Sequence, residues 1–244
     1  MTQTTAAPLR IEPCPKRLRT YLGGALIADT DRARLVWEVP PYPAYYLPEA
    51  DVDMSRFSAN GRTRASETRG EAQLFDVAGG EGKLAVDGAW HYPESPVAEL
   101  RDLVRIDWRA MDSWFEEEEE VFIHPRSPYT RIDVLPSSRH VEVMVNGVKV
   151  VDTNRSMVLF ETGRPPRYYV PTEDIRMDLL EPTETVTGCP YKGFASYWTV
   201  HAGKETYPDL AWSYRTPLPE SARIAELVCI WDTHVETRVD DRLV

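Results

Sequence analysis

The chain has 244 residues, of which 42% are hydrophobic, so it is long and apolar enough to build one large core or two small ones. It carries 28 Lys+Arg against 39 Asp+Glu, a formal charge of −11. This acidic balance argues against nucleic acid as a partner, because phosphate binding requires clustered Lys and Arg. The 20 prolines favour a loop-rich, mostly β protein, since proline interrupts helices.

Neither a signal peptide nor a membrane span is expected, because the chain lacks apolar runs of the required length. Its three cysteines, Cys14, Cys189 and Cys229, stand alone in the sequence. Such spacing argues against a disulfide framework and against a four-ligand zinc site. The histidines also lack the spacing of metal ligands on one face of an element. We therefore expect a cytoplasmic protein with no membrane contact, no metal and no cofactor.

An internal repeat is the main feature of the sequence. Residues 158–161 repeat the pattern of 35–38, and residues 166–171 repeat that of 43–48, both at an offset of 123. A constant offset over most of each half indicates two copies of one domain. The sequence therefore predicts a mostly β protein made of two tandem small antiparallel domains, each with one short helix.

The elements of the first copy are expected within residues 1–112. A hairpin comes first, over residues 21–27, where apolar residues flank a glycine pair. A single short helical pattern follows over 96–103. The five consecutive glutamates at 116–120 are expected to form a solvated linker between the copies, because like charges packed this densely repel one another and stay in water.

The second copy, with this linker, is expected within residues 113–244. Its hairpin over 140–150 turns at Asn146-Gly147, the dipeptide best suited to a type I′ turn. Alternating apolar residues predict a further strand pair around 195–200. The short helix of this copy is expected over 219–227, where proline stands at the first position.

Four motifs of the second copy together resemble one known family. They lie at 163–169, 176–180, 187–193 and 211–212, and the segment 124–134 looks like the two-copy members found in bacteria. The family is the domain of unknown function number 427, also catalogued as a nucleotidyltransferase-like domain. The resemblance implies a small antiparallel β domain of the β-tent kind, and it implies no established reaction.

The residues do not support nucleotidyl transfer. A two-metal reaction requires paired carboxylates, which Asp51 and Asp53 would supply in the first copy. The second copy has Asp174 and Arg176 at these positions, so the pair is lost where the family resemblance is best. Residues 79–83 look like a phosphate loop but lack the Ser or Thr that should follow the lysine.

Cys189 is the candidate for a catalytic role. Lys192 lies three residues further on and could lower the pKa of the thiol, which would favour a nucleophilic or redox-active thiolate. A cysteine nucleophile normally also needs a base, and the nearest histidine in the sequence is His201. The alternative is that Cys189 is a half-buried packing residue.

Aromatic and charged residues of the second copy form the candidate binding site. Aromatic walls with cationic groups suit a planar or anionic small molecule. Arg167 is Ala44 in the first copy, so the fold does not require an arginine there. The predicted ligand-binding residues are Arg167, Tyr168, Asp178, Tyr191, Lys192, Trp198 and Trp212.

Three functions therefore remain open from the sequence. The leading one is the binding of a small ligand, with anions among the candidates, in a groove of the second copy. The second is an enzyme that uses Cys189 as nucleophile or redox thiol. The third is a scaffold in which the two copies merely pack on each other. For Tyr169, Trp198 and Trp212, the alternative to a binding role is the core of the domain, since aromatic residues dominate small cores.

Overall fold

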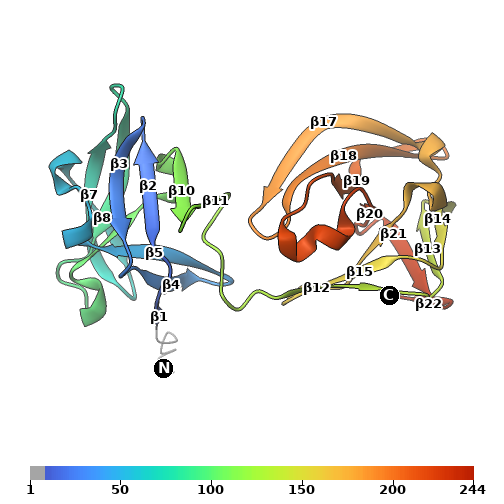
Figure 1. Cartoon of the computed structure of the whole chain (residues 1–244), viewed down its shortest axis with the longest axis horizontal. Helices are drawn as coiled ribbons and strands as arrows, with labels where there is room; N and C mark the ends of the chain where they lie inside the picture. Colours follow the sequence, from blue (N-terminus) through green and yellow to red (C-terminus); the bar gives the residue numbers. More distant parts are fainter. Residues whose placement is uncertain (1–8) are drawn as a thin grey trace, which may run out of the picture. The chain divides into compact units, whose positions relative to one another are not determined.

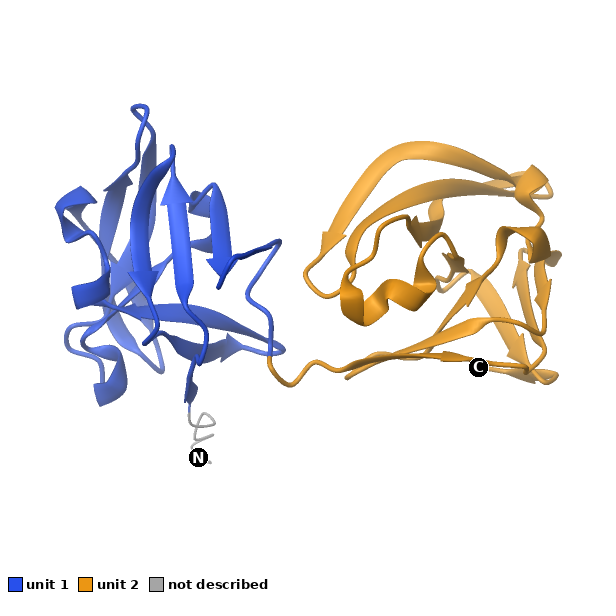
Figure 2. Cartoon of the chain, in the orientation of Figure 1, with its two compact units in different colours: residues 1–127 blue, residues 128–244 orange. Residues whose placement is uncertain are grey.

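A computed structural model describes residues 9–244 (Figure 1). The chain divides into two compact units, residues 1–127 and 128–244 (Figure 2). The boundary thus lies later than the sequence suggested, because strands after residue 112 complete the first unit. Within the described residues, no helix is long and apolar enough to cross a membrane.

The first unit consists of two antiparallel sheets. Its seven-stranded sheet contains, in spatial order, β1 (Arg10–Pro13), β4 (Arg34–Val39), β5 (Tyr42–Pro48), β9 (Leu103–Ile106), β8 (Leu84–His91), β7 (Gly70–Ala78) and β6 (Phe57–Ser66). Its four-stranded sheet contains β11 (Glu119–Val121), β10 (Ser113–Glu116), β2 (Leu18–Leu22) and β3 (Ala25–Thr30).

The second unit repeats this architecture with the same strand order. Its seven-stranded sheet contains β12 (Ile132–Pro136), β15 (Met157–Glu161), β16 (Arg167–Val170), β20 (Val228–Ile230), β19 (Glu205–Tyr214), β18 (Gly193–Ala202) and β17 (Leu180–Cys189). Its four-stranded sheet contains β14 (Val148–Thr153), β13 (Val141–Val145), β21 (Val235–Val239) and β22 (Arg242–Leu243). The predicted tandem antiparallel β fold is therefore confirmed.

The hairpin turn between β13 and β14 follows from its two central residues. Asn146 and Gly147 have φ angles of 47° and 74°, both in the left-handed region that a type I′ turn requires. In the first unit, Gly23 and Gly24 occupy the same turn between β2 and β3, with φ angles of 56° and 72°. Both predicted hairpins are therefore confirmed.

The helical segments are 3-10 turns, and the described residues contain no α-helix. The predicted helices over 219–227 and 96–103 correspond to η7 (Pro219–Ile224) and the shorter η3 (Ala98–Leu100). The other turns are η1 (Glu49–Asp51), η2 (Met54–Arg56), η4 (Trp108–Ala110), η5 (Thr172–Asp174) and η6 (Met177–Leu179).

Each seven-stranded sheet buries residues on both faces. Side chains alternate along a strand, so Tyr45 and Tyr46 of β5 point to opposite faces. Tyr45 belongs to the main core of the first unit, together with buried residues of the four-stranded sheet such as Leu18. Tyr46 belongs to a second cluster with Leu100 of η3. Neighbouring residues of β5 therefore pack in different hydrophobic clusters, one on each face of the sheet.

The glutamate run is not a linker, contrary to the sequence-based expectation. Strand β10 pairs with both β2 and β11, and the glutamates belong to this β10–β11 hairpin. Glu116 is only 6% exposed and accepts hydrogen bonds from Tyr45 Oη and Lys16 Nζ, each at 2.5 Å. Its neighbours Glu117 and Glu118 are exposed. The alternation of the strand thus turns one carboxylate inward.

Candidate functional site

A cavity of about 300 Å³ lies in the second unit. Arg167 and Tyr168 enter it from β16, and Trp231 enters it from the segment directly after β20. The complete lining is Val143, Pro165, Pro166, Arg167, Tyr168, Cys229, Ile230, Trp231, Thr237 and Val244. The walls are thus largely apolar and contain one charged side chain.

Arg167 is the charged group of this cavity. Its guanidinium carbon lies 3.5 Å from the ring centroid of Trp231. Its Nη1 donates to the backbone carbonyls of Pro165 and Pro166, at 3.2 and 3.3 Å. Partial burial lowers the pKa of Arg167, and within residues 9–244 no carboxylate forms an ion pair with it. The guanidinium is therefore able to accept an anion.

Lys192 does not line this cavity. Its Nζ lies 2.6 Å from Oε2 of Glu161, and the two side chains are only 12% and 18% exposed. In the first repeat, Arg69 and Glu38 hold the corresponding positions, with Nε and Oε1 3.8 Å apart. A cation and a carboxylate stand here in both copies, so this pair belongs to the fold.

The predicted aromatic residues do not gather around Arg167. Trp198 pairs with Ala211 across the β18–β19 ladder, whereas Trp212 pairs with Tyr197. The two indoles consequently point to opposite faces of the sheet and pack in different clusters. Trp212 Nε1 donates to Tyr169 Oη at 3.2 Å. Of the predicted aromatic residues, only Tyr168 lines the cavity.

Asp178 and Tyr191 also lie outside this cavity. The Asp178 carboxylate accepts two hydrogen bonds from Arg176, at 2.7 and 2.6 Å, and its side chain is 60% exposed. Tyr191 follows β17, and its carbonyl accepts a hydrogen bond from Ser221 of η7 at 3.4 Å. The prediction that these residues share one groove with Arg167 is therefore wrong.

His201, the histidine nearest to Cys189 in the sequence, has partners other than this thiol. Cys189 is half-buried at the end of β17. His201, the candidate base, instead lies 3.0 Å from Glu181 through Nε2 and 3.3 Å from Thr206 through Nδ1. The cysteine of the cavity is Cys229, where burial raises the pKa of the thiol to about 12.

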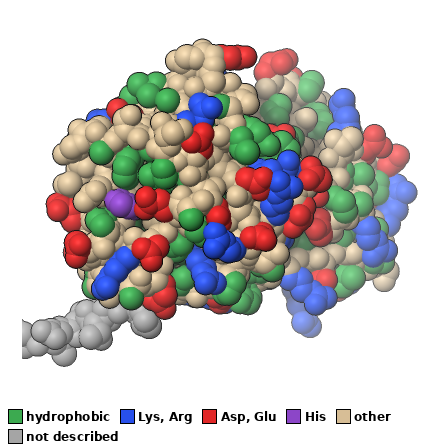
Figure 3. Space-filling model, turned by 60° about the vertical axis from the view of Figure 1, so that its left-hand side comes forward, with side chains coloured by type: hydrophobic (Ala, Val, Ile, Leu, Met, Phe, Trp, Pro, Cys, Tyr) green, Lys and Arg blue, Asp and Glu red, His purple; other side chains and the backbone are tan. Residues whose placement is uncertain are grey.

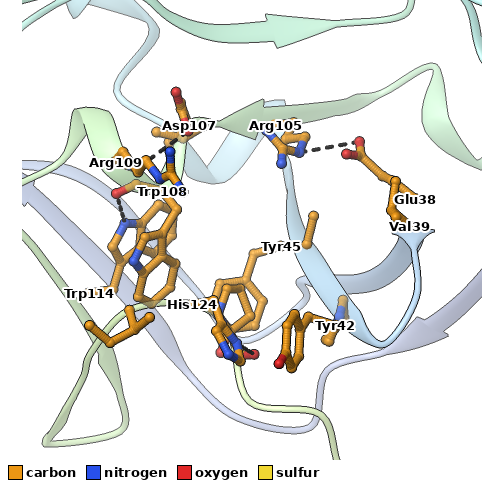
Figure 4. Close-up of a pocket in the computed structure, with 15 residues that line it drawn as sticks. Glu38, Val39, Tyr42, Tyr45, Arg105, Asp107, Trp108, Arg109, Trp114 and His124 are labelled. Carbon is orange, nitrogen blue, oxygen red and sulfur yellow. Dashed lines mark hydrogen bonds and ion pairs between the residues drawn. The ribbon is translucent and has the colours of Figure 1, made fainter. Parts of the chain in front are cut away.

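The first unit has its own cavity, of about 430 Å³ (Figure 4). It was missed from the sequence, which placed the ligand site in the second copy only. Aromatic rings dominate its walls, together with Glu38, Arg105, Asp107 and Arg109. The rings belong to Tyr42, Tyr45, Trp108, Trp114 and His124.

The two cavities occupy the same place in the repeat. In the second unit, Tyr169 pairs with Cys229, and in the first unit Tyr46 pairs with Arg105. Ala44 and Arg167 each precede these paired tyrosines by two residues, and each lines the cavity of its own unit. The lining nevertheless differs in charge and in aromatic content.

The four-stranded sheets differ in the same way. Trp114 pairs with Thr20 of β2, and Thr237 pairs with Val143 of β13. Trp114 and Thr237 are thus equivalent residues of the two cavities. The first-unit cavity gains an indole at this position, and the second-unit cavity gains a hydroxyl.

One group of side chains in the described part of the chain could approach a metal ion. The potential ligand atoms of His140, Glu142 and Asp241 lie within 4.8 Å of one another. The ammonium of Lys149 forms ion pairs with Glu142 and with Asp152, the latter at 2.8 Å. The ammonium of Lys149 thus competes with a metal ion for Glu142, one of the three potential ligands.

Charged side chains are mixed on the face of the molecule that Figure 3 shows. Lys and Arg side chains lie among Asp and Glu side chains there. Outside the grey residues, this face has no extended surface of one sign.

The two units define a tandem-repeat, all-β protein with a ligand-sized cavity at the same place in each repeat. The chain belongs to the family described as domain of unknown function (DUF427), which it matches twice, over residues 10–117 and 133–241. These matches confirm the family resemblance and the two copies. A search of curated proteins found no match.

Proposed function

We propose that the chain binds a small anionic ligand in the second-unit cavity, with Arg167 as the anion-binding group. The proposal depends on the environment of the Arg167 side chain. Arg167 is partly buried, packs on Trp231 and has no carboxylate partner among residues 9–244. Buried charges in proteins are normally paired, so a ligand anion would complete the site.

The rest of the lining indicates what the ligand carries besides its charge. Pro165, Pro166, Tyr168 and Ile230 supply apolar surface. A volume of about 300 Å³ holds a single ring with a short substituent. A ring-bearing carboxylate therefore fits both the charge and the walls, and a guanidinium can bind a carboxylate through two parallel hydrogen bonds.

The test uses benzoate and a panel of ring-bearing carboxylates of similar size, with benzamide as the uncharged control. Ligands that bind the folded state raise the melting temperature by mass action. We expect the carboxylates to stabilise the wild-type protein and benzamide to have little effect. Arg167→Ala should weaken carboxylate binding by about tenfold or more, because hydrogen bonds to charged groups contribute about 1.5–3 kcal/mol.

Arg164→Ala is the matched control, since Arg164 is exposed, lies on the loop directly before β16 and does not line the cavity. It should bind the carboxylates as the wild type does. Arg167→Ala should itself leave stability within about 0.5 kcal/mol, because the first repeat folds with Ala44 at this position. Equal carboxylate binding by both variants, or several kcal/mol of destabilisation by Arg167→Ala, would refute the proposal.

A further inference from the structure

We infer that the first-unit cavity is a separate binding site for an uncharged, planar heteroaromatic compound. This site lies among residues 38–125, shares no residue with the second-unit cavity and does not depend on the function proposed for it. Its walls, its charge balance and its polar edge each support this ligand class.

One wall of the cavity is a pair of stacked indoles. The rings of Trp108 and Trp114 lie 5.1 Å apart with an interplanar angle of 6°. Trp114 Nε1 donates to the carbonyl of Trp108 at 3.2 Å, which fixes the inner ring. Tyr45 packs beside them at 5.8 Å from Trp114, and its hydroxyl donates to the buried Glu116. The aromatic surface is thus already ordered for a flat ligand.

A second pair of rings lies nearby in the cavity. Tyr42 and His124 have centroids 3.7 Å apart (Figure 4). Partial burial lowers the pKa of His124, which favours the uncharged form of its imidazole. Its Nδ1 lies 2.8 Å from the carbonyl of Pro125, which holds the ring in place. This pair therefore adds flat, uncharged surface.

The charges of the lining balance one another. The lining contains two acidic residues, Glu38 and Asp107, and two arginines, Arg105 and Arg109. Glu38 Oε1 lies 3.2 Å from Arg105 Nε, and Asp107 accepts a hydrogen bond from the backbone of Arg109 at 3.3 Å. The anion-binding arginine of the second unit is Ala44 here. Only Glu38 and Arg105 form an ion pair with each other, but the four side chains together carry no net charge, which favours a ligand without net charge.

The polar edge lies where Glu38 and Arg105 point toward one another (Figure 4). The pair presents a hydrogen-bond acceptor beside a donor. A ring that carries an N–H next to a C=O complements this arrangement, with the N–H facing the carboxylate and the C=O facing the guanidinium. The volume of about 430 Å³ holds a compound of one or two fused rings.

Trp108 and Tyr42 can be changed without removing a residue that the fold requires. In the second unit, the residue equivalent to Trp108 is Asp232, and the residue equivalent to Tyr42 is Pro165. Trp108 is also only partly buried. Truncation of either ring should therefore alter the cavity and leave both sheets intact.

The experiment is calorimetric titration of the full chain with quinazolinone, a neutral bicycle whose N–H adjoins a C=O. N-methylquinazolinone, which lacks that N–H, and benzoate are the comparison ligands. We expect quinazolinone to bind the wild type and N-methylquinazolinone to bind it at least tenfold more weakly. Benzoate, titrated into Arg167→Ala to exclude the second-unit cavity, should also bind at least tenfold more weakly than quinazolinone. Trp108→Ala should weaken quinazolinone binding about tenfold or more, and Trp108→Phe should retain most of it.

Arg167→Ala separates this inference from the proposed function, because it alters only the second-unit cavity. It should leave quinazolinone binding unchanged. The absence of quinazolinone binding, or binding that survives both Trp108→Ala and Tyr42→Ala, would overturn the inference. Loss of binding in Arg167→Ala would also overturn it, since the ligand would then lie in the other unit.

Discussion

Lys192 and Glu161 form an ion pair whose Nζ–Oε2 distance is 2.6 Å, with both side chains mostly buried. The sequence predicts instead that Lys192 lowers the pKa of the Cys189 thiol and binds a ligand. The first repeat keeps a cation and a carboxylate at the same two positions, Arg69 and Glu38, although most of its other site residues differ. The pair is therefore a structural element that the duplication retained.

Removal of Lys192 should consequently destabilise the protein. Lys192→Ala leaves the Glu161 carboxylate buried without its partner, which we expect to cost about 2–3 kcal/mol in the free energy of unfolding. Urea unfolding followed by circular dichroism measures this cost. Lys204→Ala, on an exposed turn, is the control and should change stability by less than about 0.5 kcal/mol. Equal effects of the two substitutions would contradict the assigned role.

The glutamate run offers a comparison between neighbours of the same residue type. Glu116 is buried and bonded to Tyr45 and Lys16, whereas Glu118 is 81% exposed and pairs with Arg19. Glu116→Ala should cost about 3 kcal/mol, because it leaves a buried hydroxyl and an ammonium unpartnered. Glu118→Ala should fall within about 0.5 kcal/mol.

Thermal and urea unfolding of these two variants provide the measurement. Tyr45→Phe is a third variant, since it keeps the ring and removes only the hydroxyl that Glu116 accepts from. Its cost should lie between the other two. A Glu116→Ala variant as stable as Glu118→Ala would mean that the run behaves as the solvated linker that its composition suggests.

The fold was predictable because its signals are local or periodic. The offset of 123 appears in the sequence itself, and Asn146-Gly147 specifies its turn through backbone conformation alone. The position of Glu116 was not predictable from the run of glutamates. Five identical residues carry no alternation, and only the pairing of β10 with β2 determines which carboxylate points inward.

The candidate site was predictable only in part. Comparison of the two copies singled out Arg167, because Ala44 shows that the fold can do without it. The same comparison could not show that Trp198 and Trp212 lie on opposite faces of the sheet, because this depends on the register between β18 and β19. Trp231 was overlooked because it stands where the first copy has Asp107, so no shared motif marked it.

A matched pair of carboxylates should shape the acid stability of the protein. Asp174 accepts hydrogen bonds from Arg155 and Thr153, which lower its pKa to about 2. Asp51 makes the corresponding contacts with Arg32 in the first unit, and its pKa is also lowered. The folded state therefore prefers the ionised carboxylates, and the stability they contribute is present above the unfolded pKa of about 3.9.

This contribution should be lost as the pH falls from about 5 toward 2, where Asp174 becomes protonated in the folded state. Asp174→Asn should reduce stability at pH 7 by about 1 kcal/mol, a value discounted because the Arg155 side chain is 59% exposed. The variant should also show a shallower loss of stability on acidification. Parallel stability–pH curves for the variant and the wild type would contradict the assignment.

The three cysteines should differ sharply in reactivity under native conditions. Cys14 and Cys229 are 4% and 1% exposed, and burial raises the pKa of both thiols, that of Cys229 to about 12. Cys189 is half-buried at the end of β17 and is the accessible one. Because alkylation requires an accessible thiolate, iodoacetamide at pH 7.5 should modify Cys189 first.

Peptide mapping by mass spectrometry at successive times measures the three rates. Cys14 and Cys229 should react only when the protein unfolds, so their modification should rise with added urea while that of Cys189 changes little. Cys189→Ser should abolish the fast reaction and leave the two slow ones unchanged. Rapid modification of Cys229 in the folded protein would mean that the second-unit cavity opens to solvent as far as its thiol, because Cys229 lines that cavity.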